Sequence, residues 1–175
     1  MKIHYYIYLI IICSVITACE NDDICAESNI TTPQLIITFK DNLNQQESKA
    51  VESLGVYAIR DNQLILIESI NSITTDSIAI PLRNDIEISE YKFYKNHSIN
   101  DGVIEGEENH ILLNYNTLEV FVSRACGFIN NYIDLSIFTY DPSIFGPPIT
   151  SWITGYEIVN PVIQNQNQAH VNIFH

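Results

Sequence analysis

Four cysteines are the residues with the clearest chemistry in this chain of 175 residues, at Cys13, Cys19, Cys25 and Cys126. A cysteine can be acylated, can bind a metal or can form a disulfide, and its neighbours and the redox state of its compartment decide which of these occurs. The first 25 residues contain three of the four, so they determine how all of them are interpreted.

Residues 1–18 have the composition of a secretory leader. Lys2 is the sole formal charge before Glu20, and an apolar run covers residues 5–12. The run is too short for a transmembrane helix, which needs about 20 apolar residues. A positive start, a short apolar stretch and small residues at the end are typical of a signal peptide, so we expect an N-terminal signal helix at residues 1–18.

The end of this leader reads Val15-Ile16-Thr17-Ala18-Cys19. It matches a bacterial lipobox, in which a branched apolar residue and small residues precede the cysteine that receives diacylglycerol and an amide-linked acyl chain such as palmitate. An uncleaved helix with an incidental Cys19 is the alternative. Two or more acyl chains anchor a protein stably. We therefore predict lipidation at Cys19, membrane attachment through that lipid, and a location at the outer membrane.

The segment 19–32 is predicted to be an acidic tether, with Glu20, Asp22 and Asp23 directly after the lipidated cysteine. It resembles the signal that sends some lipoproteins to the outer face of the outer membrane, but a solvated tether explains the same residues. The cell surface and the periplasmic face therefore both stay open. The formal net charge of −13 argues against nucleic acid as a partner, because like charges repel.

Cys25 and Cys126 are the two thiols left once Cys13 is removed with the leader and Cys19 is acylated. In an oxidising compartment two remaining cysteines are expected to pair. No metal-binding motif surrounds them, and we expect neither a metal nor another cofactor.

The rest of the chain is rich in Ile, Val, Tyr, Phe and Thr, which favours strands. Residues 33–175 suffice for one domain with its own core. We predict an all-β antiparallel sandwich, immunoglobulin-like or barrel-like. The predicted strands are 34–40, 54–60, 63–70, 77–82, 87–95, 110–115, 118–125, 131–140, 152–163 and 169–174.

Several details of this prediction can be checked individually. Asp61-Asn62 is a hairpin turn signal, residues 64–67 are apolar on both faces as in a central strand, and Pro81 places its strand at a sheet edge. Residues 41–53 are expected to form a loop or short helix, and residues 96–109 and 141–150 loops. In the strand 131–140 we expect Ile133, Leu135 and Ile137 on one face, with Asp134 and Ser136 on the other.

A series of short motifs occurs in a fixed order along the chain. They are Asp22-Asp23-Ile24-Cys25, the segment 31–37 (TTPQLII), Ile80-Pro81-Leu82, the segment 123–128 (SRACGF), the segment 160–163 (NPVI) and the segment 169–173 (AHVNI). The ordered set resembles an uncharacterised family of Bacteroidota lipoproteins known as a domain of unknown function. The resemblance implies a two-cysteine all-β lipoprotein and no known activity.

The other reactive side chains do not form a catalytic motif. There is no G-x-S-x-G, and Ser143 lies in a proline-rich segment. His170 and His175 are five residues apart, so on one strand they point to opposite faces, and His170 is expected to be a hydrogen-bonded structural histidine. His97 and His110 flank an acidic segment without the spacing of an EF-hand. Its carboxylates are Glu105, Glu107 and Glu108.

Two further features are candidate sites. Asp76-Ser77-Ile78 resembles the short acceptor of Bacteroidota O-glycosylation, which makes Ser77 a candidate. Residues 144–149 (IFGPPI) place apolar side chains in an expected loop, which either binds a partner or folds back over the domain.

We therefore expect a non-enzymatic, lipid-anchored protein of the cell envelope that acts as an interaction or accessory module with an unknown protein or glycan partner. The alternative is a carbohydrate-binding lipoprotein that uses exposed aromatic residues such as Tyr140, Phe145 or Trp152. A third reading is an envelope enzyme whose site has no familiar motif.

Overall fold

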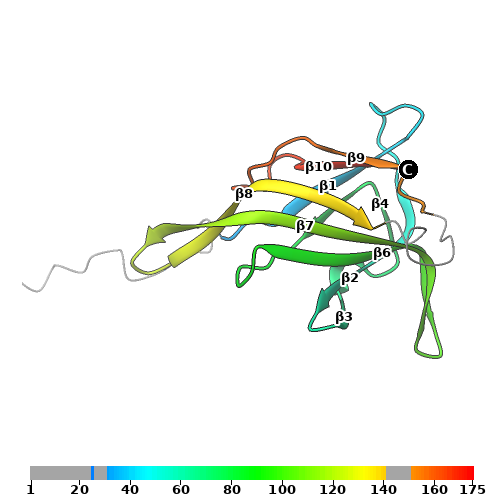
Figure 1. Ribbon diagram of the computed structural model, residues 1–175, viewed down its shortest axis with the longest axis horizontal. Coiled ribbons are helices and arrows are strands. Elements are labelled where there is room, and N and C mark those ends of the chain that lie inside the picture. Colours follow the sequence, from blue (N-terminus) through cyan, green and yellow to red (C-terminus); the bar gives the residue numbers. More distant parts are fainter. Residues whose placement is uncertain (1–24, 26–30, 141–150) are drawn as a thin grey trace, which may run out of the picture. The chain divides into compact units, whose positions relative to one another are not determined.

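A computed structural model describes residues 25, 31–140 and 151–175 and confirms the predicted all-β class (Figure 1). The chain divides into two compact units. The smaller consists of Met1–Thr31 and Val120–Ile129, and the larger of Thr32–Glu119 and Asn130–His175. Among the described residues, no helix is long and apolar enough to cross a membrane.

One sheet of the larger unit has four strands in the order β5-β1-β10-β9. These strands are β1 (Leu35–Lys40), β5 (Ser77–Ile80), β9 (Gly155–Ile158) and β10 (Val171–Phe174). β10 pairs antiparallel with β9, which confirms the predicted last hairpin, and β5 lies at the edge, as Pro81 predicted. β1 and β10 run parallel, an exception to the expected antiparallel pattern.

The other sheet has the strand order β3-β2-β6-β7-β8, and β4 pairs with β2 beside this path. Its strands are β2 (Val51–Arg60), β3 (Gln63–Leu66), β4 (Ile73–Thr75), β6 (Ile88–Asn100), β7 (Val103–Ser123) and β8 (Gly127–Tyr140), with a 3-10 turn η2 (Glu68–Ile70) between β3 and β4. β2 begins at Val51, so the expected loop or helix at 41–53 is a loop that ends three residues earlier.

The two sheets share one hydrophobic core, which gives the larger unit the architecture of a sandwich. Inward positions alternate along β1, where Leu35, Ile37 and Phe39 are buried, because successive side chains of a strand point to opposite faces. Phe93 and Leu113 come from the other sheet and are fully buried in the same cluster. Each such side chain stabilises the fold by about 1.5–3 kcal/mol relative to exposure.

β7 differs most from the sequence prediction. Residues 110–115 and 118–125 were expected to form two strands and residues 96–109 a loop, but Val103–Ser123 is one continuous strand of 21 residues. It runs beside β6 and β8 in Figure 1, and the β6–β7 connection is the tight turn at Asp101-Gly102. The two ends of β7, residues 103–108 and 116–123, contain no buried residue, so no alternation of buried and exposed positions marks them in the sequence.

The prediction for β3 was also wrong. The turn signal at Asp61-Asn62 is confirmed, since both residues have the positive φ of a two-residue hairpin turn, 51° and 60°. β3, however, is the outer strand of its sheet, and Leu64 and Ile65 are 40% and 46% exposed. An apolar run on both faces therefore marks an edge strand here and not a central one.

β8 contains a local irregularity at Asp134, whose φ is 57°. Tyr132 and Leu135 are both buried although they are three positions apart, an odd number, so one extra residue interrupts the alternation, as in a β-bulge. Leu135 and Ile137 lie in the core as predicted, but Ile133 is half-buried and does not belong to that buried set.

Candidate functional site

The turn between β7 and β8 belongs to the smaller unit and has a defined local geometry. The backbone N–H of Cys126 donates to Ser123 Oγ at 3.0 Å, which closes the turn. Gly127 follows with a φ of +69°, a conformation that costs a residue with a Cβ about 1–2 kcal/mol. No atom lies within 4 Å of a Cβ built there, so the backbone conformation alone requires glycine.

Cys25 and Cys126 form a disulfide, which confirms the predicted pairing. Their Cα atoms are 4.9 Å apart and 101 positions separate them in the sequence. The bond links the segment that precedes the first strand to the β7–β8 turn. The position of Cys25 is therefore fixed relative to this turn by a covalent bond.

Two phenylalanines flank the same turn, one on each strand. Phe121 and Phe128 are 55% and 60% exposed, and their rings pack edge to face with centroids 5.2 Å apart. The segment Val120–Ile129 contains no carboxylate, and its single charge is the exposed Arg124. In a chain with 21 acidic residues this segment is an apolar, weakly cationic surface.

A second group of polar side chains surrounds His97 at the end of β6 in the larger unit. The ring is 3% exposed; its Nε2 lies 2.8 Å from Tyr57 Oη and its Nδ1 2.7 Å from Ser72 Oγ. Ser53 Oγ donates to the His97 carbonyl at 2.8 Å. A Cβ at Gly55 would lie 2.4 Å from the imidazole ring, so glycine makes room for it. Burial lowers the pKa of His97.

The contact between Ser72 and His97 has the atoms of a serine–histidine pair, in which a base activates a nucleophile. Burial raises the pKa of Tyr57, so this phenol stays protonated and can donate to Nε2. With Tyr57 as the donor, Nδ1 carries the ring proton and donates to Ser72 Oγ; with Ser72 as the donor to Nδ1, Nε2 carries the proton and donates to Tyr57 Oη. Both ring nitrogens are hydrogen-bonded in either tautomer, so these contacts hold the ring in place.

The acidic segment 105–108 lies on β7, and its carboxylates contact different partners. Glu105 accepts from Asn100 Nδ2 at 2.5 Å, and Glu107 accepts from Asn96 Nδ2 at 3.0 Å. Glu108 accepts from Tyr94 Oη at 2.6 Å and pairs with Lys92. Residues 25, 31–140 and 151–175 hold no group of three or more His, Cys, Asp or Glu side chains arranged to bind a metal ion.

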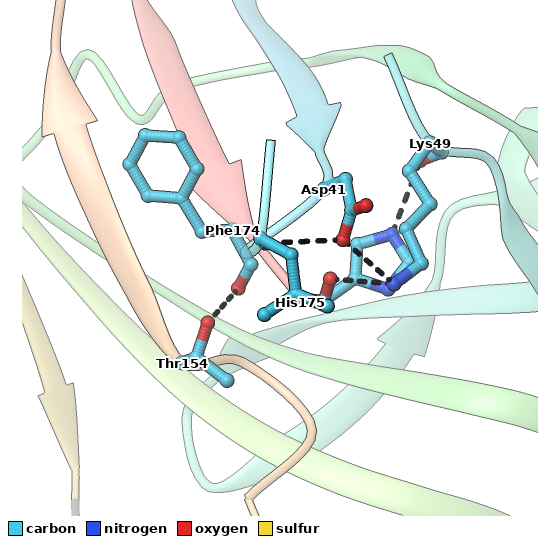
Figure 2. A network of polar contacts seen from close by, with 6 residues as sticks. Asp41, Lys49, Thr154, Phe174 and His175 are labelled. Atoms are coloured by element: carbon cyan, nitrogen blue, oxygen red, sulfur yellow. Dashed lines mark hydrogen bonds and ion pairs between the residues drawn. The ribbon is translucent and has the colours of Figure 1, made fainter. Parts of the chain in front are cut away.

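The last residues of the chain form a separate polar network around His175 (Figure 2). Lys49 Nζ lies 3.2 Å from Asp41 Oδ1 and 2.8 Å from the His175 carbonyl oxygen, while His175 Nε2 lies 3.1 Å from the Lys49 carbonyl. The imidazole also packs edge to face on Phe39 and Trp152. These contacts join the loop after β1 to the end of β10.

His170 is buried and hydrogen-bonded, as predicted. It is 1% exposed, and its Nδ1 accepts a hydrogen bond from the backbone N–H of Ile36 at 3.0 Å. Its own N–H donates to the Ile36 carbonyl at 2.9 Å. These two bonds continue the pairing of β1 with β10 by one residue.

The other candidate residues are not gathered at one place. Ser77 is exposed on the edge strand β5, and its Oγ donates to the Ile37 carbonyl at 3.3 Å. Trp152 is 6% exposed, so it is not available for stacking on a sugar. Five other predicted or candidate positions lie outside the described residues: Cys13, Cys19, Ser143, Phe145 and the apolar segment 144–149.

A shallow hollow of about 60 Å³ lies beside β2 and β6, and its lining includes Arg60, Arg83 and Tyr91. Arg83 is already paired with Asp85, whose pKa it lowers to about 2 through a side-chain hydrogen bond. Ligand pockets usually measure about 300–1,000 Å³. This hollow has room for only a few water molecules and is too small for a sugar ring.

Sequence reasoning missed two of these arrangements. The Phe121–Phe128 pair had a usable signal, because the two residues are equally distant from the turn centre at Arg124-Ala125 and therefore face each other across a hairpin. The Tyr57–His97–Ser72 contacts had none, because they depend on the irregular pairing between Lys95 and Ser98.

The strand order and the disulfide define a two-sheet all-β protein with a cross-linked hairpin turn. Residues 53–175 match the family described as a family of unknown function (DUF6452), which is most of the chain. The chain belongs to this family. Neither the search of curated proteins nor the search of solved structures found a match.

Proposed function

We propose that this protein is a lipid-anchored protein of the cell envelope, held at the outer membrane by acyl chains on Cys19, and that it acts as an interaction or accessory module without enzymatic activity. The observation that carries the proposal is the Cys25–Cys126 disulfide. Such bonds are typical of exported proteins and rare in the reducing cytosol. An exported chain whose leader ends in Val-Ile-Thr-Ala-Cys is a substrate for lipoprotein processing.

An interaction role is supported by the kind of surface the described residues carry. They offer an exposed aromatic pair at the β7–β8 turn and a hollow too small for a substrate. Both ring nitrogens of His97 contact side-chain hydroxyl groups of the fold, those of Tyr57 and Ser72. The carbohydrate-binding alternative loses one of its aromatic residues, because Trp152 is buried.

The anchor is tested by mass spectrometry of the mature N-terminus, with Cys19→Ala as the control. We expect a mature chain that begins at an acylated Cys19, and an unprocessed, unacylated chain for the variant. An unacylated cysteine in the native protein would disprove the anchor. Protease treatment of intact cells then tests the face of the membrane: Glu20, Asp22 and Asp23 predict outward display, and neutral residues at all three positions should reduce cleavage.

The interaction role is tested by affinity purification of the acylated protein from solubilised membranes, with Cys19→Ala purified in parallel. We expect a defined protein or glycan to co-purify in a fixed ratio with the acylated form and to be depleted with the variant. Turnover of an envelope substrate by the purified protein, abolished by Ser72→Ala, would instead show that it is an enzyme.

A further inference from the structure

The β7–β8 turn exposes apolar surface where a charged turn would be expected. Phe121 and Phe128 remain more than half exposed although their rings pack on each other. Val120–Ile129 has no acidic residue, and its one charge is that of Arg124. A surface of two aromatic rings beside one arginine fits the boundary between lipid headgroups and acyl chains, where aromatic side chains bury their rings and arginine contacts phosphate.

Covalent connections limit how far this turn can be from the lipid. Six peptide units join Cys19 to Cys25, and a fully extended chain covers at most about 3.3–3.6 Å per residue, so the two Cα atoms are no more than about 22 Å apart. The disulfide adds 4.9 Å between the Cα atoms of Cys25 and Cys126. Phe128 follows Cys126 by two residues.

We propose that the β7–β8 turn is a second membrane contact, in which Phe121 and Phe128 enter the headgroup boundary of the bilayer that holds Cys19; this rests on the acylation proposed above. A short tether makes the second contact intramolecular, with an effective concentration in the millimolar range. Two partly exposed rings therefore suffice for binding that would be negligible without the tether.

The charges of the chain are consistent with this choice of surface. A net charge of −13 repels an anionic bilayer, and Glu20, Asp22 and Asp23 lie within the tether itself. A segment free of carboxylates lets apolar side chains approach the lipid without bringing a negative charge with them. The contact is therefore apolar, and it forms on zwitterionic vesicles.

The experiment uses full-length acylated protein reconstituted into phosphatidylcholine vesicles with brominated acyl chains, which quench tryptophan fluorescence at close range. Phe128→Trp reports on the turn. Phe138→Trp is the matched control, because Phe138 is also on β8, is 55% exposed and lies in the larger unit. The single native tryptophan, Trp152, supplies the background, which is measured in the unmodified protein.

We expect at least about twofold stronger quenching for Phe128→Trp than for Phe138→Trp, and a return to the control level when the disulfide is reduced. Equal quenching of the two variants, or quenching unaffected by reduction, would overturn the membrane contact. The mass of the N-terminus separates the two proposals. Acylated protein without selective quenching disproves the contact and leaves the anchor intact, whereas unacylated protein disproves the anchor and the contact together.

Discussion

The two ends of β7 carry turns built from different chemistry. At the β6–β7 turn, Glu105 and Glu107 accept hydrogen bonds from Asn100 and Asn96 across the hairpin. At the β7–β8 turn, a disulfide and a pair of phenylalanine rings replace these polar contacts. Neither turn contributes a residue to the hydrophobic core cluster, so neither is stabilised by burial in it.

This difference shows two ways to stabilise a hairpin turn that contributes no residue to the hydrophobic core. Polar cross-strand pairs contribute about 0.2–1 kcal/mol each and leave the turn free to face water. A disulfide adds stability without covering the apolar side chains beside it. The polar side chains of the β6–β7 turn therefore face water. The β7–β8 turn leaves its two phenylalanine rings exposed at the surface.

The largest effect is expected from breaking the disulfide. Cys126→Ser should lower the free energy of unfolding by up to about 4.7 kcal/mol, the chain-entropy value for a loop of about 100 residues. Urea denaturation measures the loss. Cys25→Ser should give the same loss and the double variant no more than either, because all three remove one bond. Single variants with an unchanged midpoint would show that the bond does not stabilise the fold.

An intermediate effect is expected from glycines near the two turns. A Cβ at Gly106 would lie 2.8 Å from the Lys95 carbonyl oxygen, and the φ there is +134°. Gly106→Ala should cost about 1–3 kcal/mol, because a backbone oxygen must move. Gly127→Ala meets no atom within 4 Å and should cost about 1–2 kcal/mol from its φ alone, without the added clash present at Gly106. Urea midpoints compare the two, and a larger loss at Gly127 would contradict this ranking.

Strands whose side chains enter the core and turns with a strong residue signal could be predicted from the sequence. Strand segments whose side chains face water could not. The buried alternation of β1 and the Asp61-Asn62 turn could be read directly from residue types. The extension of β6 and β7 could not, because polar residues such as Glu105 and Glu107 occupy strand positions that face water. The bulge at Asp134 depends on a left-handed backbone conformation, for which an aspartate gives only a weak preference.

The candidate site was also predictable only in part, because some of its contacts follow from residue types and others depend on the three-dimensional arrangement. Counting the thiols in a chain that was expected to be exported was enough to pair Cys25 with Cys126. The contacts of His97 required the three-dimensional arrangement, because Tyr57 and Ser72 reach it from other segments of the chain. Residue types alone placed His97 in a polar loop, whereas it is buried at the end of a strand.

The buried histidines are expected to have the smallest effect. At neutral pH they do not lower the free energy of unfolding, and the loss grows only as the pH falls. Burial lowers the pKa of His97 below its ordinary value of 6.5, and burial does the same for His170 and His175. The unfolded chain therefore binds more protons between each folded pKa and about 6.5. The stability contributed by the neutral rings is complete above pH 6.5 and is lost as the pH falls from there through the folded values.

A comparison of the free energy of unfolding at pH 7.5 and at pH 5.0 measures this effect, and two hydrogen-bonded carboxylates stay charged over that range. A backbone hydrogen bond from Leu43 lowers the pKa of Asp41. For Glu108, desolvation raises the pKa, but hydrogen bonds from Lys92 and Tyr94 outweigh it and the pKa is lowered. Both groups therefore stay ionised at pH 5.0, and we expect the three buried histidines to contribute to the change in unfolding free energy.

The same acidification should distinguish the two turns of β7. His97 lies at the end of the hairpin that carries the β6–β7 turn, whereas Val120–Ile129 contains no histidine and no carboxylate. Amide protection factors next to His97 should fall at pH 5.0, and those of residues 120–129 should not. His97→Gln keeps polar atoms at this position without a titrating ring, so it should reduce the loss near residue 97. An equal loss at both turns, or a loss that persists in the variant, would mean that another group governs the acid response.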